Sequence, residues 1–178
     1  YQLSSQPTEF NRTDQQNYSS FYPRRLSAEV LYDSVNAVAD TPSDFGTIPQ
    51  GTTAVQLPDN GFSNYFLEVF GKPEAESACE CERSAEANLS QSLHLLNSGD
   101  VEGRLQNGQG RAARFNREPD RPDADKIREL YLAAFAREPR PEESTFVLTQ
   151  IADYQNKQQA WEDLIWAILN TREFQFVK

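Results

Sequence analysis

The chain has 178 residues, a formal net charge of −10 and a hydrophobic fraction of 38%. This length fits one domain. The negative charge argues against nucleic acid and anionic membranes, because both are bound through Lys and Arg. No stretch approaches the roughly 20 apolar residues of a membrane span. We therefore expect residues 1–178 to form a single acidic, water-soluble domain.

The beginning of the chain lacks the basic start and the apolar run of a signal peptide, and the sequence contains no Met. We expect the chain to be a processed or excised part of a larger protein.

Residues 1–23 are polar and turn-rich but carry scattered aromatic residues, which favours an irregular arm laid over the surface. A first helix is expected at 24–40, opened by Pro23. Two faces are predicted for it. The inner face comprises Leu26, Val30, Leu31, Val35 and Val38, and the outer face Arg25, Glu29, Asp33 and Asn36.

Residues 41–83 form the least regular segment and are predicted to be a long insertion. The stretch 52–57 fits a short strand, so that the insertion has room for a small β-hairpin. The stretch 65–70 is apolar on both faces, and its pattern does not separate a buried strand from a short helix.

Residues 84–178 are predicted to be a helical bundle. Gly99 is expected to end its first helix in the left-handed conformation, and a short helix follows Asp100. Three amphipathic helices then begin near Asp123, at Pro141 and before Trp161. Their expected inward residues are Ile127, Leu130, Tyr131, Ala134 and Phe135, then Phe146, Val147, Ile151 and Tyr154, and finally Trp161, Leu164, Ile165, Ile168 and Leu169.

The predicted fold class is therefore mainly α, an irregular bundle of about five helices with a loop-rich insertion. Eight residues are expected to share one core, because apolar residues recur at helical spacing along their helices and form stripes. They are Leu89, Leu93, Leu96, Tyr131, Phe135, Trp161, Ile165 and Ile168.

Five segments together carry a resemblance to a known family. They read YPRRLSAEVLYD (22–33), FLEVFGKPE (66–74), CECERS (79–84), QSLHLLNS (91–98) and DLIWAILN (163–170). With them the chain resembles the C-terminal domain of unknown function of large planctomycete-type proteins that often carry an N-terminal c-type cytochrome domain. This resemblance implies an exported, periplasmic or cell-envelope protein and carries over no activity. The chain has no Cys-x-x-Cys-His haem motif, and we expect no cofactor.

Cys79 and Cys81 form the most distinctive pair of side chains. A disulfide, two reduced buried thiols, and a metal or redox role are all compatible with their spacing. We expect the two residues to be bonded or within bonding distance, with Arg83 close by, at the start of the helix that carries His94. Their bond would close a very small loop, so that it would add little stability.

The remaining candidates favour structural roles. His94 is the only histidine, and its usual role would be a hydrogen-bonded structural one. Arg24, Arg25 and Arg83 are candidates for anion or ion-pair contacts, because Arg recognises anions in a bidentate manner. On a helix, Arg25 would also form an ion-pair ladder with Glu29 and Asp33. No catalytic residues and no metal ligands are predicted.

The sequence thus favours a non-catalytic interaction or structural module of a larger, cytochrome-associated protein. Its expected partners are other domains of that protein or other envelope proteins, and an oligomer remains open. The alternatives are an enzyme, either thiol-redox or polysaccharide-directed, and a carbohydrate-binding module that uses exposed Tyr and Trp. A concave site with converging polar groups would separate a binding or catalytic domain from a flat scaffold.

Overall fold

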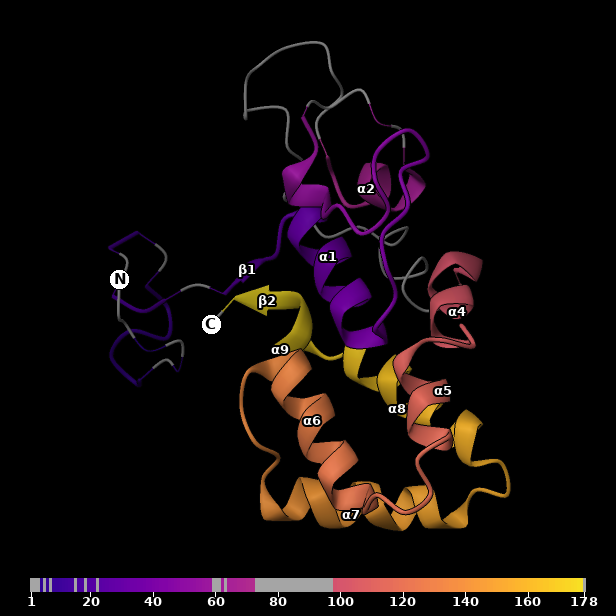
Figure 1. The fold of residues 1–178 in the computed structure, drawn as a ribbon. Coiled ribbons are helices and arrows are strands. Elements are labelled where there is room, and N and C mark those ends of the chain that lie inside the picture. Colours follow the sequence, from indigo (N-terminus) through magenta and orange to yellow (C-terminus); the bar gives the residue numbers. More distant parts are fainter. Residues whose placement is uncertain are drawn as a thin grey trace.

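Helices dominate the part of the chain that the structure describes, which confirms the predicted fold class (Figure 1). The structure is a computed structural model, and it describes residues 4, 6, 8–14, 16–17, 19–21, 23–58, 62, 64–72 and 98–177. The elements are β1 (Arg24–Arg25), α1 (Ala28–Ala39), the 3₁₀ helix η1 (Ala54–Gln56), α2 (Tyr65–Val69), α4 (Gly99–Leu105), α5 (Arg111–Asn116), α6 (Asp123–Phe135), α7 (Pro141–Asp153), α8 (Lys157–Leu169), α9 (Arg172–Gln175) and β2 (Phe176–Val177).

The first helix begins later than the sequence predicts, at Ala28 instead of residue 24. Residues 24–25 pair antiparallel with Phe176–Val177 as β1 and β2, and the Leu26 amide donates to the Gln175 carbonyl over 3.0 Å. The backbone before Ala28 therefore forms hydrogen bonds with residues near the C-terminus and not within a helix. Among the described residues the strands lie here, and not in the 41–83 insertion where a hairpin was considered.

The buried face of α1 differs from the predicted one at three positions. Val30 is exposed although it was placed inside, whereas Glu29 and Asn36 are buried although they were placed outside. The polar atoms of the Asn36 side chain are satisfied, because its amide group donates to the Ser43 hydroxyl over 2.9 Å and accepts from Arg104. Hydrophobic periodicity cannot reveal such a partner far away in the sequence.

Two elements in the described part of the insertion, η1 and α2, lie against α1. Residues 54–56 form a 3₁₀ helix, so the suggested strand at 52–57 is wrong. The Asp33 carboxylate accepts from the amides of Ala54 and Val55 over 2.6 and 3.1 Å, and it thereby satisfies the free N-terminal donors of η1. Residues 65–69 are helical, and the Asn64 side chain caps them.

Two short helices, α4 and α5, precede the three longer helices of the bundle. Gly99 is the first residue of α4 and does not adopt the left-handed conformation that the sequence suggests. The α5 helix is not predicted by the sequence. It begins after Gly110, where an added Cβ would lie 3.0 Å from the Ala39 carbonyl oxygen. This close approach brings Arg111 to the last turn of α1, where it donates to the carbonyls of Ala37 and Val38.

The three helices α6, α7 and α8 confirm the predicted bundle, and Pro141 is the first residue of α7 as expected. Val147 and Ile151 are buried, but Phe146 is 65% and Tyr154 37% exposed, so the predicted inward face of α7 is too wide. Only one narrow stripe of α7 contacts its neighbours.

One core joins α1 and α2 to α5, α6 and α8. Of the eight predicted core residues, Tyr131, Trp161, Ile165 and Ile168 are buried, and Phe135 is partly buried against the same core. The other three, Leu89, Leu93 and Leu96, lie outside the described residues. The rings of Phe115 and Trp161 meet edge to face at 5.0 Å, which makes α5 the partner of α8 at the centre.

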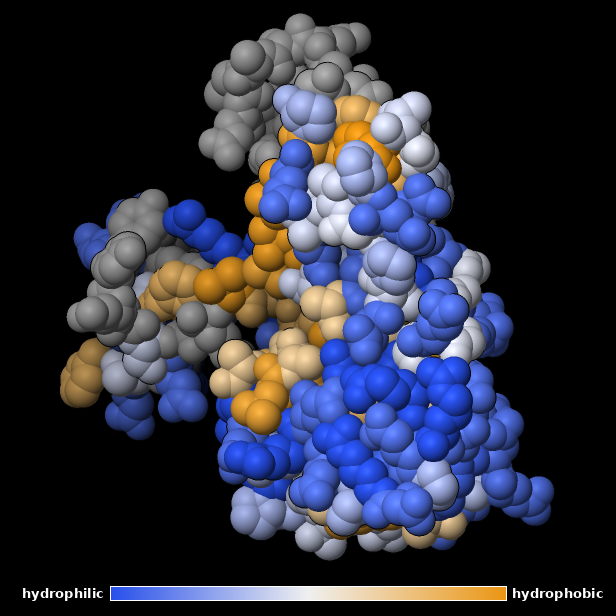
Figure 2. All heavy atoms as spheres, in the orientation of Figure 1, coloured by the Kyte–Doolittle hydropathy of each residue, from blue (hydrophilic) through white to orange (hydrophobic). Residues whose placement is uncertain are grey.

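The N-terminal arm is irregular, as expected, but its described residues do not lie over the helices. Figure 1 shows the arm beside the helical body, and Phe10 is 98% exposed. Hydrogen bonds within the arm hold it together, including the one from Asn11 to the Ser19 carbonyl. Figure 2 shows hydrophobic residues gathering where the arm meets the body, whereas the face over α6 is hydrophilic.

Candidate functional site

The residues that the sequence singled out are only partly described. Cys79, Cys81, Arg83 and His94 all lie outside the described residues. Their predicted arrangement therefore remains a prediction.

Arg24 and Arg25 lie in β1 and not on a helix. The predicted ion-pair ladder through Arg25 on one helix face is therefore wrong, and Asp33 instead caps η1. In the described part of the chain, the Nε and Nη1 atoms of Arg25 are buried without a hydrogen-bond partner. Its guanidinium lies 5.6 Å from the Phe176 ring centroid, and burial lowers its pKa. Arg24 is exposed. For the anion contact predicted for Arg25, its Nε and Nη1 atoms are available as donors, and the described residues give them no acceptor.

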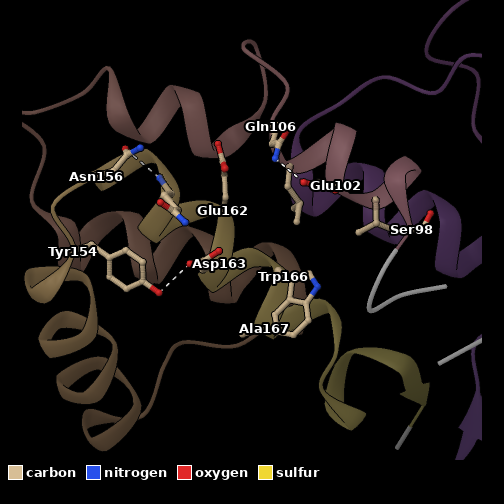
Figure 3. Close-up of a pocket in the computed structure, with 12 residues that line it drawn as sticks. Ser98, Glu102, Gln106, Tyr154, Asn156, Glu162, Asp163, Trp166 and Ala167 are labelled. Atoms are coloured by element: carbon tan, nitrogen blue, oxygen red, sulfur yellow. Dashed lines mark hydrogen bonds between the residues drawn. The ribbon is translucent and has the colours of Figure 1, made fainter. Parts of the chain in front are cut away.

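An open cleft lies between α4 and α8 (Figure 3). Its volume is about 860 Å³, within the range of ligand sites. We call it the α4–α8 cleft. Its lining residues are Ser98, Val101, Glu102, Leu105, Gln106, Tyr154, Asn156, Gln159, Glu162, Asp163, Trp166 and Ala167.

One wall of the cleft comes from α4. The Ser98 hydroxyl accepts from the Asp100 amide over 3.1 Å and so starts this helix. The lining positions 98, 101, 102, 105 and 106 recur at helical spacing and therefore occupy one face. Val101 and Leu105 are buried, and they anchor this wall on the core. Glu102 and Gln106 remain at the surface, where they hydrogen-bond to each other over 2.9 Å.

The opposite wall comes from α8, which begins at a cap formed by Asn156. The Asn156 side chain accepts from the amides of Gln158 and Gln159. The positions 159, 162, 163, 166 and 167 again share one face, while Trp161 and Ile165 anchor the other face in the core. Two stripes with the same spacing therefore oppose each other across the cleft.

Two partly exposed aromatic residues belong to this surface. Tyr154 follows α7, and its hydroxyl donates to Asp163 Oδ2 over 2.9 Å, as Figure 3 shows. This hydrogen bond raises the pKa of Tyr154 and keeps the hydroxyl a donor. Trp166 is 38% exposed on the otherwise polar face of α8. The cleft therefore offers aromatic surface next to a carboxylate.

The charged residues that line the cleft are all acidic. Glu102, Glu162 and Asp163 contribute carboxylates, and the twelve described lining residues include no Lys or Arg. Each carboxylate already accepts a hydrogen bond, Glu102 from Gln106, Glu162 from Gln158 and Asp163 from Tyr154. None of the three is fully buried. Within the described ranges, no three acidic, His or Cys side chains are grouped as a metal site would require.

A second polar cluster lies at Glu129, where α1, α5 and α6 meet. Its carboxylate accepts from Arg111, from Arg114 at 2.5 Å, and from Arg121 at 2.7 Å. Burial alone would raise the pKa of Glu129, but the hydrogen bonds from Arg114 and Arg121 outweigh it and lower the pKa. Arg114 also pairs with Asp40 over 3.3 Å. This cluster satisfies its own charges and joins three helices.

The α4–α8 cleft is not evident from the sequence. Its two walls are separated by about 60 residues, and each wall alone is the ordinary polar face of an amphipathic helix. The one signal in the sequence was Trp166, a large aromatic residue among Gln159, Glu162 and Asp163 on that face.

The described elements form a mainly helical domain with an open, acidic cleft. Residues 1–151 match the model of the PSD1 family, described as protein of unknown function (DUF1553), and the chain belongs to this family. Comparisons with curated proteins and with solved structures give no match.

Proposed function

We propose that this domain is a non-catalytic interaction module, and that the α4–α8 cleft is where it contacts its partner. The observation that carries the proposal is a cleft of about 860 Å³ between two opposed helical stripes, with two partly exposed aromatic residues, Tyr154 and Trp166, in its lining. Protein–protein contact sites are enriched in Tyr and Trp at their centres.

The carboxylates of the cleft favour binding over hydrolysis. A glycosidase needs one carboxylic acid whose pKa is raised by an apolar environment. Glu102 and Asp163 are exposed and Glu162 is half-buried, and each accepts a hydrogen bond from a neighbouring side chain. These polar, partly exposed surroundings are not the apolar environment that the general acid of a glycosidase requires.

The setting in a larger protein is part of the same proposal. The segments 22–33 and 66–74 resemble those of planctomycete-type, cytochrome-associated proteins of the cell envelope, and we propose an exported location on that basis. The partner would then be another domain of the parent protein or another envelope protein. In the described part of the chain, no helix combines the length and the apolar character that crossing a membrane requires.

A peptide-display selection tests the contact site. A random dodecapeptide library is selected on the wild-type chain and counter-selected on Ala167→Trp, which fills the cleft. The matched control is Ala133→Trp, at an exposed position of α6. We expect clones that bind the wild type and Ala133→Trp but lose at least about tenfold in affinity on Ala167→Trp. A library that yields no clone separating the two variants would refute the cleft as contact site.

Carbohydrate binding is the second candidate, and the exposure of Tyr154 and Trp166 favours it. The apolar face of a sugar ring can lie against an aromatic ring while its hydroxyls donate to carboxylates. Affinity electrophoresis in gels containing neutral polysaccharides tests it, with Trp166→Ala as the variant. Retardation of the wild type alone would support this candidate, and equal mobility of both in every gel would rule it out.

A further inference from the structure

We infer that the segment bound in the α4–α8 cleft is cationic, a stretch of a partner protein that presents Lys or Arg side chains. This inference rests on the proposed function and adds the chemistry of the partner. Three observations carry it: the charge of the lining, the engagement of the nearby cations, and the aromatic surface.

The lining is acidic from both walls. Glu102 comes from α4, and Glu162 and Asp163 come from α8, so that a ligand between the helices meets carboxylates on both sides. A carboxylate has about four acceptor positions, so one hydrogen bond from Tyr154 leaves Asp163 able to accept more. A concave surface of one charge sign concentrates ligands of the opposite sign. The net charge of −10 acts in the same direction.

The cations closest in sequence to the walls are engaged elsewhere. The Arg104 guanidinium pairs with Asp100 at 3.0 Å, and it lies 4.5 Å from the Tyr32 ring centroid. The Lys157 ammonium donates to the Ile151 carbonyl over 2.7 Å. Neither is among the residues that line the cleft. Among the described residues, the hydrogen bonds of the carboxylates in the cleft come from the neutral side chains of Gln106, Gln158 and Tyr154.

The aromatic residues favour the same occupant. An ammonium or guanidinium group is attracted to the face of an aromatic ring, most strongly to Trp. Tyr154 and Trp166 are both partly exposed at the cleft, and the Tyr154 hydroxyl contacts Asp163. A cation can therefore contact an aromatic ring and a carboxylate at the same time. An acidic segment would be repelled, and a neutral sugar could hydrogen-bond to the carboxylates but would gain nothing from attraction between opposite charges.

The test uses fluorescein-labelled octapeptides of four Lys-Gly repeats, with Gln-Gly and Glu-Gly peptides of the same length as probes of charge. Fluorescence anisotropy is measured on the whole chain. We expect the Lys peptide to bind, the other two to bind at least about tenfold more weakly, and the affinity to fall as salt rises.

The decisive comparison is between two neutralising substitutions. Asp163→Asn keeps an acceptor for Tyr154 but removes a charge from the cleft, whereas Glu142→Gln removes the same charge from an exposed site on α7. We expect Asp163→Asn to weaken Lys-peptide binding about fivefold and Glu142→Gln less than twofold. Thermal unfolding of both variants checks that the fold is kept.

Equal effects of Asp163→Asn and Glu142→Gln would overturn the inference, because attraction would then depend on net charge alone. Tight binding of the neutral peptide, or of a neutral oligosaccharide at Trp166, would overturn it as well. If the display selection yields clones specific for the cleft that lack Lys and Arg, the contact site stands and its cationic partner is refuted. If no clone is specific for the cleft, both fail.

Discussion

Arg137 shows how single side chains hold the C-terminal helices in place. Its guanidinium makes paired hydrogen bonds to Glu143, both at 2.8 Å, and to Glu173, both at 3.0 Å. It also lies 5.5 Å from the Tyr131 ring centroid. Glu143 belongs to α7 and Glu173 to α9, so one planar cation joins the end of α6 to both.

This ion pair makes stability depend on pH. The hydrogen bond from Arg137 lowers the pKa of Glu143 from 4.5 to about 2. A lowered folded-state pKa contributes stability above the unfolded value, and the contribution is lost as the pH falls from about 5 towards 2. We expect Glu143→Gln to cost about 1–2 kcal/mol at pH 7, since the pair is partly exposed, and the cost to vanish near pH 2. Urea unfolding across this range measures it.

Glu142→Gln is the matched control, because Glu142 lies beside Glu143 in the first turn of α7 but is exposed. It is expected to change the free energy of unfolding by less than about 0.5 kcal/mol at every pH. A cost of Glu143→Gln that persists unchanged to pH 2 would show that packing, and not charge, is responsible.

Arg25 is expected to destabilise the isolated chain through its charge. Two of its guanidinium nitrogens are buried without a hydrogen-bond partner in the described part of the chain. Replacing an incompletely paired buried charge by an apolar side chain of similar length is often neutral or stabilising. We expect Arg25→Met to keep or raise the melting temperature, and Arg24→Met, at an exposed position, to leave it unchanged. A drop for Arg25→Met alone would mean that its charge is paired in solution.

Among the elements, α5 depends on one close backbone contact. A Cβ at Gly110 would lie 3.0 Å from the Ala39 carbonyl oxygen and 3.2 Å from that of Asn107. Neither backbone atom can move without shifting α1 or the start of α5. We expect Gly110→Ala to lower the free energy of unfolding by about 1–3 kcal/mol. Thermal and urea unfolding measure this loss.

Gly108→Ala is the control that separates the effect of the close contact at Gly110 from the effect of alanine on the freedom of the unfolded chain. Nothing lies within 4 Å of a Cβ at Gly108, and its φ is not positive. Alanine there should leave stability unchanged or raise it by up to about 1 kcal/mol, because it reduces the freedom of the unfolded chain. Similar losses for both variants would contradict the explanation by close approach.

The elements also show where sequence reasoning succeeds. The bundle of α6, α7 and α8 was predictable because each helix is long enough for its apolar stripe to repeat, as with Trp161, Ile165 and Ile168. The α5 helix has only six residues, too few for a stripe to repeat. β1 was missed because its partner strand lies at the other end of the chain. The inward face of α7 was predicted too wide, because periodicity treats Phe146 and Val147 alike, although Val147 is buried and Phe146 is exposed.

For the whole molecule, the described core extends beyond the segment that matches the family. The match ends at residue 151, whereas α8 and α9 supply some of the most buried side chains. These are Ala160, Trp161, Ile165, Ile168, Leu169 and Phe174. Without them, Phe115 would lose the indole ring that it meets at 5.0 Å. Residues 1–151 therefore do not contain all the partners that their own buried face requires.

We expect a chain cut after residue 151 to lose cooperative folding. Removing one large core side chain costs about 3–5 kcal/mol, and a domain of this size has only about 5–15 kcal/mol in total. Circular dichroism during heating should show a sharp transition for residues 1–178 and a gradual one for 1–151. A chain lacking residues 1–19, whose described side chains are nearly all exposed, should keep the sharp transition. Cooperative melting of 1–151 would contradict this account of the core.

The β1–β2 pair has a consequence for the order in which the chain folds. It joins Arg24 to Val177, residues roughly 150 positions apart. Closing a loop of that length costs about 2 kcal/mol more entropy than closing one of 15 residues, and a two-residue ladder returns little of it. The helical hairpins of α6, α7 and α8 have short loops and should form early. The strand pair should close last and open first, so that the Leu26 amide exchanges with solvent through local opening while the helices remain folded.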